Sequence, residues 1–315
     1  MNILVFGKDG QLGKAFKTVF NAMPVSAKPN VEYIGRAECD LSDGAVLKNL
    51  LDSSKPTFII NASAYTAVDQ AETEPELAFA VNALAPELMA QYAAEHGSTF
   101  FHYSTDYVFD GSKAGFYFED DQRNPLGVYG KSKAAGEIAI EKAFKGSQGQ
   151  YAIFRTSWVY GDGGNFIRTI LRLAKDREEL KIIHDQHGVP TSAKWLAKTT
   201  LDLGLDKDQI RKFTSGIYHA VPGGETTWHG LACLAVDAAL KAGASLKVRP
   251  DLIKPILAVE YPLPAPRPMN SRMNTNKLRK EIARDDDVSK LQQWSGSWST
   301  GVEVYVQALV KDGLI

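Results

Sequence analysis

The chain has 315 residues, of which 44% are apolar and 23% charged, and its formal net charge is −1. These values are typical of a globular protein with one large or two unequal domains, and the near-neutral charge argues against a surface for nucleic acid or anionic membranes. No apolar run reaches the ~18 residues of a membrane span, and the start lacks the features of a signal peptide. Cys39 and Cys233 are too few for a disulfide framework. We therefore expect a cytoplasmic protein with neither membrane nor nucleic-acid partners.

The first residues predict a strand, a glycine turn and a helix. An apolar run at residues 1–6 precedes Gly7, Gly10 and Gly13, and helical periodicity follows over residues 11–22. Glycines at this spacing permit a tight turn and let the backbone approach a phosphate, while the helix N-terminus offers free N–H groups. The segment therefore predicts a site for the pyrophosphate of a dinucleotide.

Strand-like and helix-like segments then alternate along the first half of the chain. We expect strands at residues 31–35, 57–62, 99–108 and 151–159, and helices at residues 43–53, 74–96 and 129–144. This alternation predicts an α/β fold with a doubly wound, Rossmann-like parallel sheet. Ligands of such sheets bind beyond the carboxyl ends of the strands.

The second half of the chain differs in character. We expect strands at residues 180–183 and 216–221, and helices at residues 165–175, 193–203, 226–241, 276–282 and 300–310. Residues 250–274 are rich in proline and should form no long regular element. Residues 1–160 should form the dinucleotide-binding domain and residues 161–315 mainly a smaller substrate-binding lobe, with residues near 216–221 rejoining the first sheet.

Tyr129 and Lys133 stand four apart in a predicted helix and should share one helix face. An ammonium beside a phenol favours the ionised phenol, which would lower the pKa of Tyr129 from its usual value of about 10. Such a phenol is a proton donor near neutral pH. A solvated surface pair is the common alternative, and the preceding glycine turn favours the catalytic interpretation.

The chain resembles the extended short-chain dehydrogenase/reductase family and, within it, the dTDP-4-dehydrorhamnose reductases. The glycine turn and the Tyr-x-x-x-Lys motif are shared by the whole superfamily, whereas later motifs are more specific. These motifs occupy residues 102–109, 128–133, 154–160, 185–191 and 267–271. The resemblance implies NAD(P)H-dependent reduction of the 4-keto group of dTDP-6-deoxy-L-lyxo-4-hexulose to dTDP-L-rhamnose.

The resemblance also implies roles for individual residues. Tyr129 would donate the proton, Lys133 would lower the pKa of Tyr129 and bind the nicotinamide ribose, and Thr105 would bind the carbonyl oxygen. The cofactor would contact Tyr129 and Lys133 together with Gly7, Gly10, Gln11, Leu12, Gly13, Arg36, Asp40, Leu41, Ala62, Ser63 and Ala64. The substrate would contact Thr105, Asp106, Trp158, Asn165 and Arg267, with Trp158 as a core residue remaining an alternative.

Cofactor choice follows from the end of the second strand. An NAD-specific site usually carries an acidic residue there, whereas this chain has Gly35 and Arg36. Arg36 could pair with a 2′-phosphate, so we expect a preference for NADPH, with NADH also accepted.

We expect no metal site. Some relatives dimerise through a metal bridged by acidic residues in the first helix and after the Pro-Thr motif, but here Lys14 and Lys194 stand near those positions. His184 and His187 are an odd number of positions apart, so on a strand they point to opposite faces. We therefore expect a monomer rather than a metal-bridged dimer.

Several other functions stay open at this point. A dehydratase of this kind would carry an Asp-Glu pair after Thr105, where this chain has Asp106 and Tyr107. Another nucleotide-sugar 4-ketoreductase or an epimerase fits the same motifs, and an epimerase would recycle its cofactor. A non-catalytic NADP-binding regulatory subunit, resembling that of methionine adenosyltransferase, is disfavoured because Thr105, Tyr129 and Lys133 are all present. The configuration at C4 of the product is not determined by the sequence.

Overall fold

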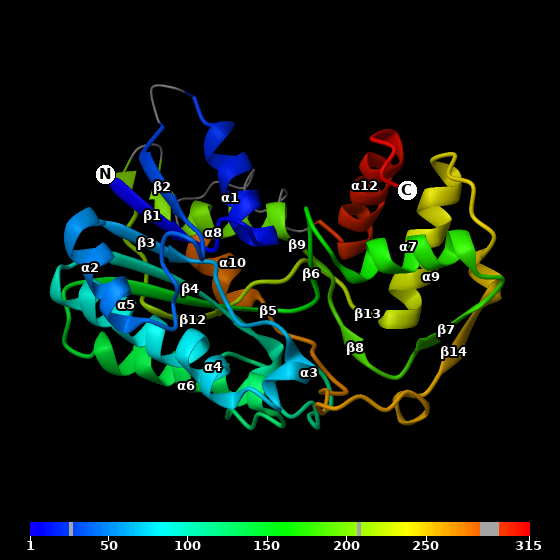
Figure 1. The fold of residues 1–315 in the computed structure, drawn as a ribbon, viewed down its shortest axis with the longest axis horizontal. Helices are drawn as coiled ribbons and strands as arrows, with labels where there is room; N and C mark the ends of the chain where they lie inside the picture. Colours follow the sequence, from blue (N-terminus) through cyan, green and yellow to red (C-terminus); the bar gives the residue numbers. More distant parts are fainter. Residues whose placement is uncertain (25–27, 207–208, 284–295) are drawn as a thin grey trace.

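The structure is a computed structural model that describes residues 1–24, 28–206, 209–283 and 296–315. Its centre is a sheet of six strands in the order β12-β5-β4-β3-β1-β2 (Figure 1). All neighbouring pairs are parallel, which confirms the predicted α/β fold. The strands are β1 (Asn2–Phe6), β2 (Asn30–Ile34), β3 (Phe58–Asn61), β4 (Thr99–Thr105), β5 (Gln150–Thr156) and β12 (Gly216–His219).

Helices cover both faces of this sheet because its strands are apolar on both sides. Ile3 and Val5 of β1 pack towards one face, with α1 (Gln11–Asn21) and α8 (Ala193–Gly204). Leu4 and Phe6 of the same strand pack towards the other face. That face is covered by α2 (Gly44–Ser54), α5 (Ala85–Glu95) and α6 (Val128–Ala143).

A second hydrophobic cluster lies beyond the carboxyl ends of the strands, at the right of Figure 1. It is built from α7 (Phe166–Asp176), α9 (Trp228–Lys241) and α12 (Trp298–Lys311). Two short parallel strands, β7 (Leu180–Ile183) and β14 (Ile253–Ile256), pack against these helices. The proline-rich segment that follows β14 leads back to the sheet, where α10 (Asn276–Ile282) packs beside β12.

Two predicted strands end earlier than the sequence indicated. Strand β4 stops at Thr105, whose side chain accepts a hydrogen bond from the Tyr107 backbone N–H and starts the short helix η3 (Asp106–Val108). Strand β5 stops at Thr156, and Trp158 has a φ of +48°, a left-handed conformation that a strand cannot contain. Residues 106–108 and 157–158 therefore lie outside the strands of the sheet.

The predicted helix at residues 74–96 has a wider turn in its middle. It comprises α4 (Pro75–Phe79), the π-helical turn η2 (Ala80–Leu84) and α5. Pro86 has no N–H to donate to the carbonyl of Asn82, which allows the turn to widen there. Gly136 of α6 packs against the same carbonyl, where a Cβ would lie 2.2 Å from the oxygen.

The remaining described elements are short. They are α3 (Val68–Ala71), β6 (Val159–Tyr160), β8 (His187–Gly188), β9 (Thr191–Ser192), β10 (Leu205–Asp206), β11 (Gln209–Ile210), β13 (Thr226–Thr227), η4 (Pro250–Leu252) and η5 (Ala258–Glu260). Within the described ranges, no helix has the length and apolar character needed to cross a bilayer.

Candidate active site

A cavity of about 640 Å³ opens at the carboxyl ends of β1, β2 and β3 and extends to α6. All the residues predicted to bind the cofactor line it, except Gly13. They are Gly7, Gly10, Gln11, Leu12, Arg36, Asp40, Leu41, Ala62, Ser63, Ala64, Tyr129 and Lys133. Residues from four separate segments thus meet at one surface.

The glycine turn is packed too closely to accept larger side chains at two of its three glycines. Gly7 has a φ of +86°, and a Cβ there would lie 2.8 Å from the backbone of Ala62 and Ser63. Gly13 does not reach the cavity because it packs on the turn, where a Cβ would lie 2.1 Å from the Gly7 carbonyl oxygen. No side chain caps α1 at Gly10, and the first residues of the helix line the cavity, so their free N–H groups are available to an anion.

The far end of the cavity carries both signs of charge. Arg36 is 77% exposed, and its Nε lies 3.4 Å from Asp40 Oδ2. Lys8 pairs with Glu38, whose carboxylate also accepts from the Gly35 backbone N–H. Hydrogen bonds from Lys8 and Gly35 lower the pKa of Glu38. The guanidinium suits a 2′-phosphate, and the carboxylates suit ribose hydroxyls.

Tyr129 and Lys133 both line the cavity, but they do not form the predicted phenol–ammonium pair. Lys133 Nζ donates to the Tyr103 carbonyl at 2.6 Å and lies 3.1 Å from His102 Nε2. Burial raises the pKa of Tyr129 to about 12, although a contact with Thr105 opposes the shift. The prediction of a lowered Tyr129 pKa is therefore wrong for this arrangement, because burial of the phenol dominates and the amine contacts Tyr103 and His102 instead.

Burial also acts on Lys133, whose side chain is 1% exposed. It lowers the pKa of Lys133 to about 7, while the charge of Glu137 opposes that change. Glu137 is itself held by Arg155, whose Nε and Nη2 donate at 3.0 and 2.7 Å. This buried pair joins α6 to β5 and so fixes the helix that carries Tyr129 and Lys133.

Thr105 and Asp106 form a small buried group beside Tyr129. Thr105 Oγ1 donates to Asp106 Oδ1 at 2.8 Å, and the hydroxyl of Ser271 donates to the other carboxylate oxygen. Burial raises the pKa of Asp106 to about 6, against the effect of these hydrogen bonds. Tyr107 packs edge-on against the Tyr129 ring, with ring centroids 5.4 Å apart.

None of the five residues predicted to bind substrate lines this cavity, and Trp158, Asn165 and Arg267, like Thr105 and Asp106, have partners of their own. Trp158 stacks on Trp228 with ring centroids 3.7 Å apart, in contact with the second hydrophobic cluster. This favours the core alternative, although Trp158 stays partly exposed. Asn165 caps α7 and donates to Gly161, Gly163 and Tyr305 oxygens and, at 3.4 Å, to Gln11 of the cavity. Arg267 is engaged by Asp69.

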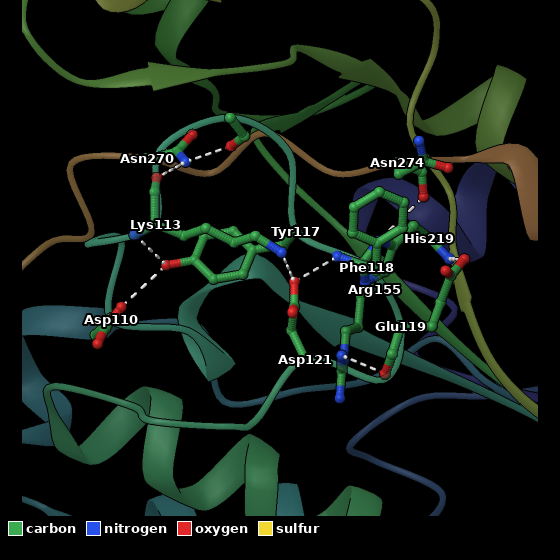
Figure 2. A network of polar contacts seen from close by, with 11 residues as sticks. Asp110, Lys113, Tyr117, Phe118, Glu119, Asp121, Arg155, His219, Asn270 and Asn274 are labelled. Atoms are coloured by element: carbon green, nitrogen blue, oxygen red, sulfur yellow. Dashed lines mark hydrogen bonds and ion pairs between the residues drawn. The ribbon is translucent and has the colours of Figure 1, made fainter.

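The loop after η3 is held over the sheet by a polar network (Figure 2). Arg155 Nη1 donates to the Glu119 carbonyl at 3.3 Å, and the His219 backbone N–H donates to Glu119 Oε1 at 3.1 Å. His219 Nδ1 lies 3.1 Å from the Asn274 carbonyl oxygen, which belongs to the segment after the prolines. The loop, the sheet and that segment are thereby joined beside Asp106.

The sequence analysis gave no role to Asn61 and His102, which form a buried chain of contacts to Lys133. His102 is fully buried, and its Nδ1 lies 3.1 Å from Asn61 Nδ2. The available signal was a histidine inside an apolar parallel strand, because buried polar side chains need partners.

The residues considered for a metal site lie apart from this group, and Lys14 lies 3.7 Å from Asp162. Among the residues described, no three His, Cys, Asp or Glu side chains are grouped to hold a metal.

Comparison with known proteins identifies the family. The family model described as the RmlD substrate binding domain matches residues 1–297. The chain belongs to this RmlD family. Two curated relatives, both dTDP-4-dehydrorhamnose reductases, are 44% identical over 292 residues (Salmonella typhimurium) and 42% identical over 291 residues (Escherichia coli K12). Each alignment covers 90% of this chain and 92% of the relative.

Solved structures of RmlD-type reductases have the same fold. The dTDP-4-dehydrorhamnose reductase of Clostridium acetobutylicum is 30% identical with a TM-score of 0.83, over 98% of this chain and 99% of that one. The enzyme of Bacillus anthracis, solved in complex with NADP, is 28% identical with a TM-score of 0.78, over 96% and 97%. The UDP-glucose 4-epimerase of Thermus thermophilus is 16% identical, which shows a shared fold alone (TM-score 0.73, 97% and 98% coverage).

Proposed function

We propose that this chain reduces the 4-keto group of dTDP-6-deoxy-L-lyxo-4-hexulose with NADPH and yields dTDP-L-rhamnose. The observation that carries the proposal is one continuous cavity. It has a phosphate-binding turn at Gly7 and Gly10 and the Tyr129–Lys133 motif at its other end. The names of the relatives and the NADP bound to the Bacillus anthracis reductase support the same substrate and cofactor.

In this proposal, the N–H groups at the start of α1 bind the pyrophosphate, and Arg36 binds the 2′-phosphate. NADH is also accepted, because Asp40 and Glu38 offer acceptors for ribose hydroxyls. The bound nicotinamide supplies the hydride. Lys133 holds the nicotinamide ribose.

Tyr129 donates its phenolic proton to the carbonyl oxygen as charge develops there. Its pKa of about 12 means that the phenol keeps this proton at neutral pH until the reaction needs it. Thr105 binds the same oxygen, which requires its hydroxyl to rotate away from Asp106. Because Lys133 holds the nicotinamide ribose beside Tyr129, its substitution should weaken both cofactor binding and turnover.

The division of labour along the chain is part of the proposal. Residues 1–160, with the strand at 216–219, would bind the dinucleotide, and the helices around the second hydrophobic cluster would bind the sugar nucleotide. Trp158 and Arg267 would contact the nucleotide base and the diphosphate. We also propose a cytoplasmic location, in keeping with the free thiols of Cys39 and Cys233.

The test is an absorbance assay of NADPH oxidation with the 4-keto-L-sugar nucleotide, followed by identification of the product. We expect one NADPH oxidised per sugar and a product with the rhamno configuration. Turnover of the sugar without net NADPH oxidation would indicate an epimerase. Cofactor binding without turnover of any 4-keto sugar nucleotide would indicate a regulatory subunit.

A further inference from the structure

A buried chain of hydrogen bonds runs from the cavity to Lys133 and has no role in the chemistry above. The backbone N–H and the hydroxyl of Ser63 both donate to Asn61 Oδ1, at 3.2 and 2.5 Å. Asn61 Nδ2 lies 3.1 Å from His102 Nδ1, and Lys133 Nζ lies 3.1 Å from His102 Nε2. Asn61, His102 and Lys133 are all buried, so each polar atom must be satisfied by these partners.

Donor counting fixes the proton on His102. A backbone N–H can only donate, so the atom of Asn61 that faces Ser63 is its oxygen. Asn61 Nδ2 then faces His102 Nδ1 and can only donate, so Nδ1 must accept and carries no proton. A neutral imidazole with a bare Nδ1 has its proton on Nε2. The imidazolium form is disfavoured because its Nδ1–H would face the Asn61 amide, which is also a donor. Burial also lowers the pKa of His102 and so favours the neutral ring.

The tautomer of His102 in turn sets the charge of Lys133. The Nε2–H group can only donate, so Lys133 Nζ must accept from it, and only an uncharged amine has the lone pair to do so. The amine can still donate a hydrogen bond to the Tyr103 carbonyl. The pKa of about 7 that burial gives Lys133 agrees with this assignment.

Few other ionisable groups act on Lys133 in the described structure. Glu137, on the same helix, favours the ammonium. However, its carboxylate is already shared by Arg155 of β5 and Arg123 of the preceding loop. Asp106 of η3 acts on Tyr129, where it raises the phenol pKa further.

We propose that His102 holds Lys133 uncharged before the cofactor binds, and that cofactor binding draws one proton from solvent onto Lys133. The inference rests on the proposed function, because it assigns the Lys133 amine to the cofactor ribose. When the amine leaves His102 for the ribose hydroxyls, its lone pair is free to take up the proton. The new ammonium then favours ionisation of Tyr129. His102 is a positioning residue in this scheme, since it acts through Lys133.

The test is calorimetry of NADP⁺ binding at pH 8 in buffers of different ionisation enthalpy. The dependence of the heat on the buffer gives the number of protons taken up, and at pH 8 the 2′-phosphate is already fully ionised. We expect uptake approaching one proton at pH 8 and much less at pH 6, where Lys133 is already charged. Lys133→Met should bind without uptake.

Two histidine variants separate the role of His102 from a general effect of losing a histidine. In His102→Gln the amide can turn its oxygen to Lys133 and accept from an ammonium, so uptake should fall by at least half while binding is retained. In His96→Gln, a control at the end of α5, uptake should match the wild type. Equal uptake in His102→Gln and the wild type would overturn the inference.

Further outcomes separate this inference from the cofactor assignment. Wild-type binding without proton uptake would overturn the role of His102 and Lys133 but leave the cofactor site standing, whereas no binding at all would overturn both. If His102→Gln does not fold, ¹⁵N NMR of the wild-type histidines provides the answer. We expect His102 to be protonated on Nε2 before NADP⁺ is added, and a proton on Nδ1 would refute the proposal.

Discussion

Arg267 forms a two-point ion pair with Asp69, 198 positions away in the sequence. Nη1 and Nη2 each lie 2.8 Å from a different oxygen of the Asp69 carboxylate, and Nη1 also donates to the Ala265 carbonyl. The pair joins the proline-rich segment to α3, which follows the cavity residues Tyr65 and Thr66. Asp69 is 41% exposed, so the pair should stabilise the fold by no more than about 1 kcal/mol. The pair therefore adds little to stability, and the test below asks whether Arg267 has the proposed role at the diphosphate.

Arg267→Ala and Asp69→Asn should have different effects if Arg267 binds the diphosphate. Arg267→Ala should raise the KM for the sugar nucleotide by about tenfold or more, because a charged hydrogen-bond donor is lost. Asp69→Asn frees the guanidinium and should leave KM unchanged or lower it. Steady-state kinetics of both variants provide the measurement. Equal increases in KM would mean that Arg267 acts only through its pair with Asp69.

Tyr129→Phe should lower kcat by about 10²–10⁴-fold, the usual contribution of a positioned general acid. The Kd for NADPH should stay within about twofold, because the ring that lines the cavity is retained. Fluorescence titration and stopped-flow absorbance check the two quantities. Tyr33→Phe, a phenol on β2, serves as the control. A Tyr129→Phe enzyme with near wild-type kcat would assign the proton to another group.

Arg36→Ala should weaken NADPH binding by about tenfold and leave NADH binding within about twofold, because only NADPH carries the 2′-phosphate. The wild type should bind NADPH more tightly than NADH. Titration of the wild type, Arg36→Ala and the distant control Arg177→Ala with both cofactors measures these effects. A wild type with tighter NADH binding would show that Arg36 is only a solvated surface residue.

Asp106→Asn should stabilise the protein at neutral pH but not in acid. Burial raises the Asp106 pKa from 3.8 to about 6, so the folded protein holds this proton more tightly than the unfolded chain does. Protonated Asp106 therefore stabilises the folded state relative to the ionised carboxylate. This contribution is fully present below pH 4 and is lost as the pH rises through 6. A shift of about two pKa units corresponds to about 3 kcal/mol at most.

Urea unfolding at pH 4 and pH 8 measures the Asp106 effect. Asp110→Asn is a control of opposite sign, since hydrogen bonds from Ser112 lower the pKa of Asp110 to about 2. The contribution of Asp110 is present above pH 4 and is lost as the pH falls towards 2, so Asp110→Asn should destabilise the protein at pH 8. If the difference between Asp106→Asn and the wild type is the same at both pH values, Asp106 does not titrate in this range.

The enzyme should be a monomer whose activity is insensitive to EDTA. The first helix carries Lys14, and Lys194 follows the Pro-Thr motif, and cationic side chains there would repel a divalent ion. Sedimentation with and without EDTA, together with the NADPH assay, measures both properties. Dissociation of a dimer by EDTA would contradict the argument, whereas a metal-free dimer would contradict only the monomer.

The sequence alone predicted the main strands and helices in chain order and most of the residues that line the cavity. Both depend on local patterns: apolar periodicity sets each element, and Gly13 is required by its contact with the Gly7 carbonyl within one strand–turn–helix unit. Because parallel strands end at the same edge, the motifs that follow them converge without further information.

The tertiary structure decided which side chains are partners. The i,i+4 spacing of Tyr129 and Lys133 was visible in the sequence, but the contact of Lys133 with His102 depends on how α6 packs against β4. The same holds for Trp158 on Trp228 and for Arg267 on Asp69, whose partners are distant in the sequence. The physical reason is that burial and pairing set the charge of an ionisable group, and both are properties of the packed chain.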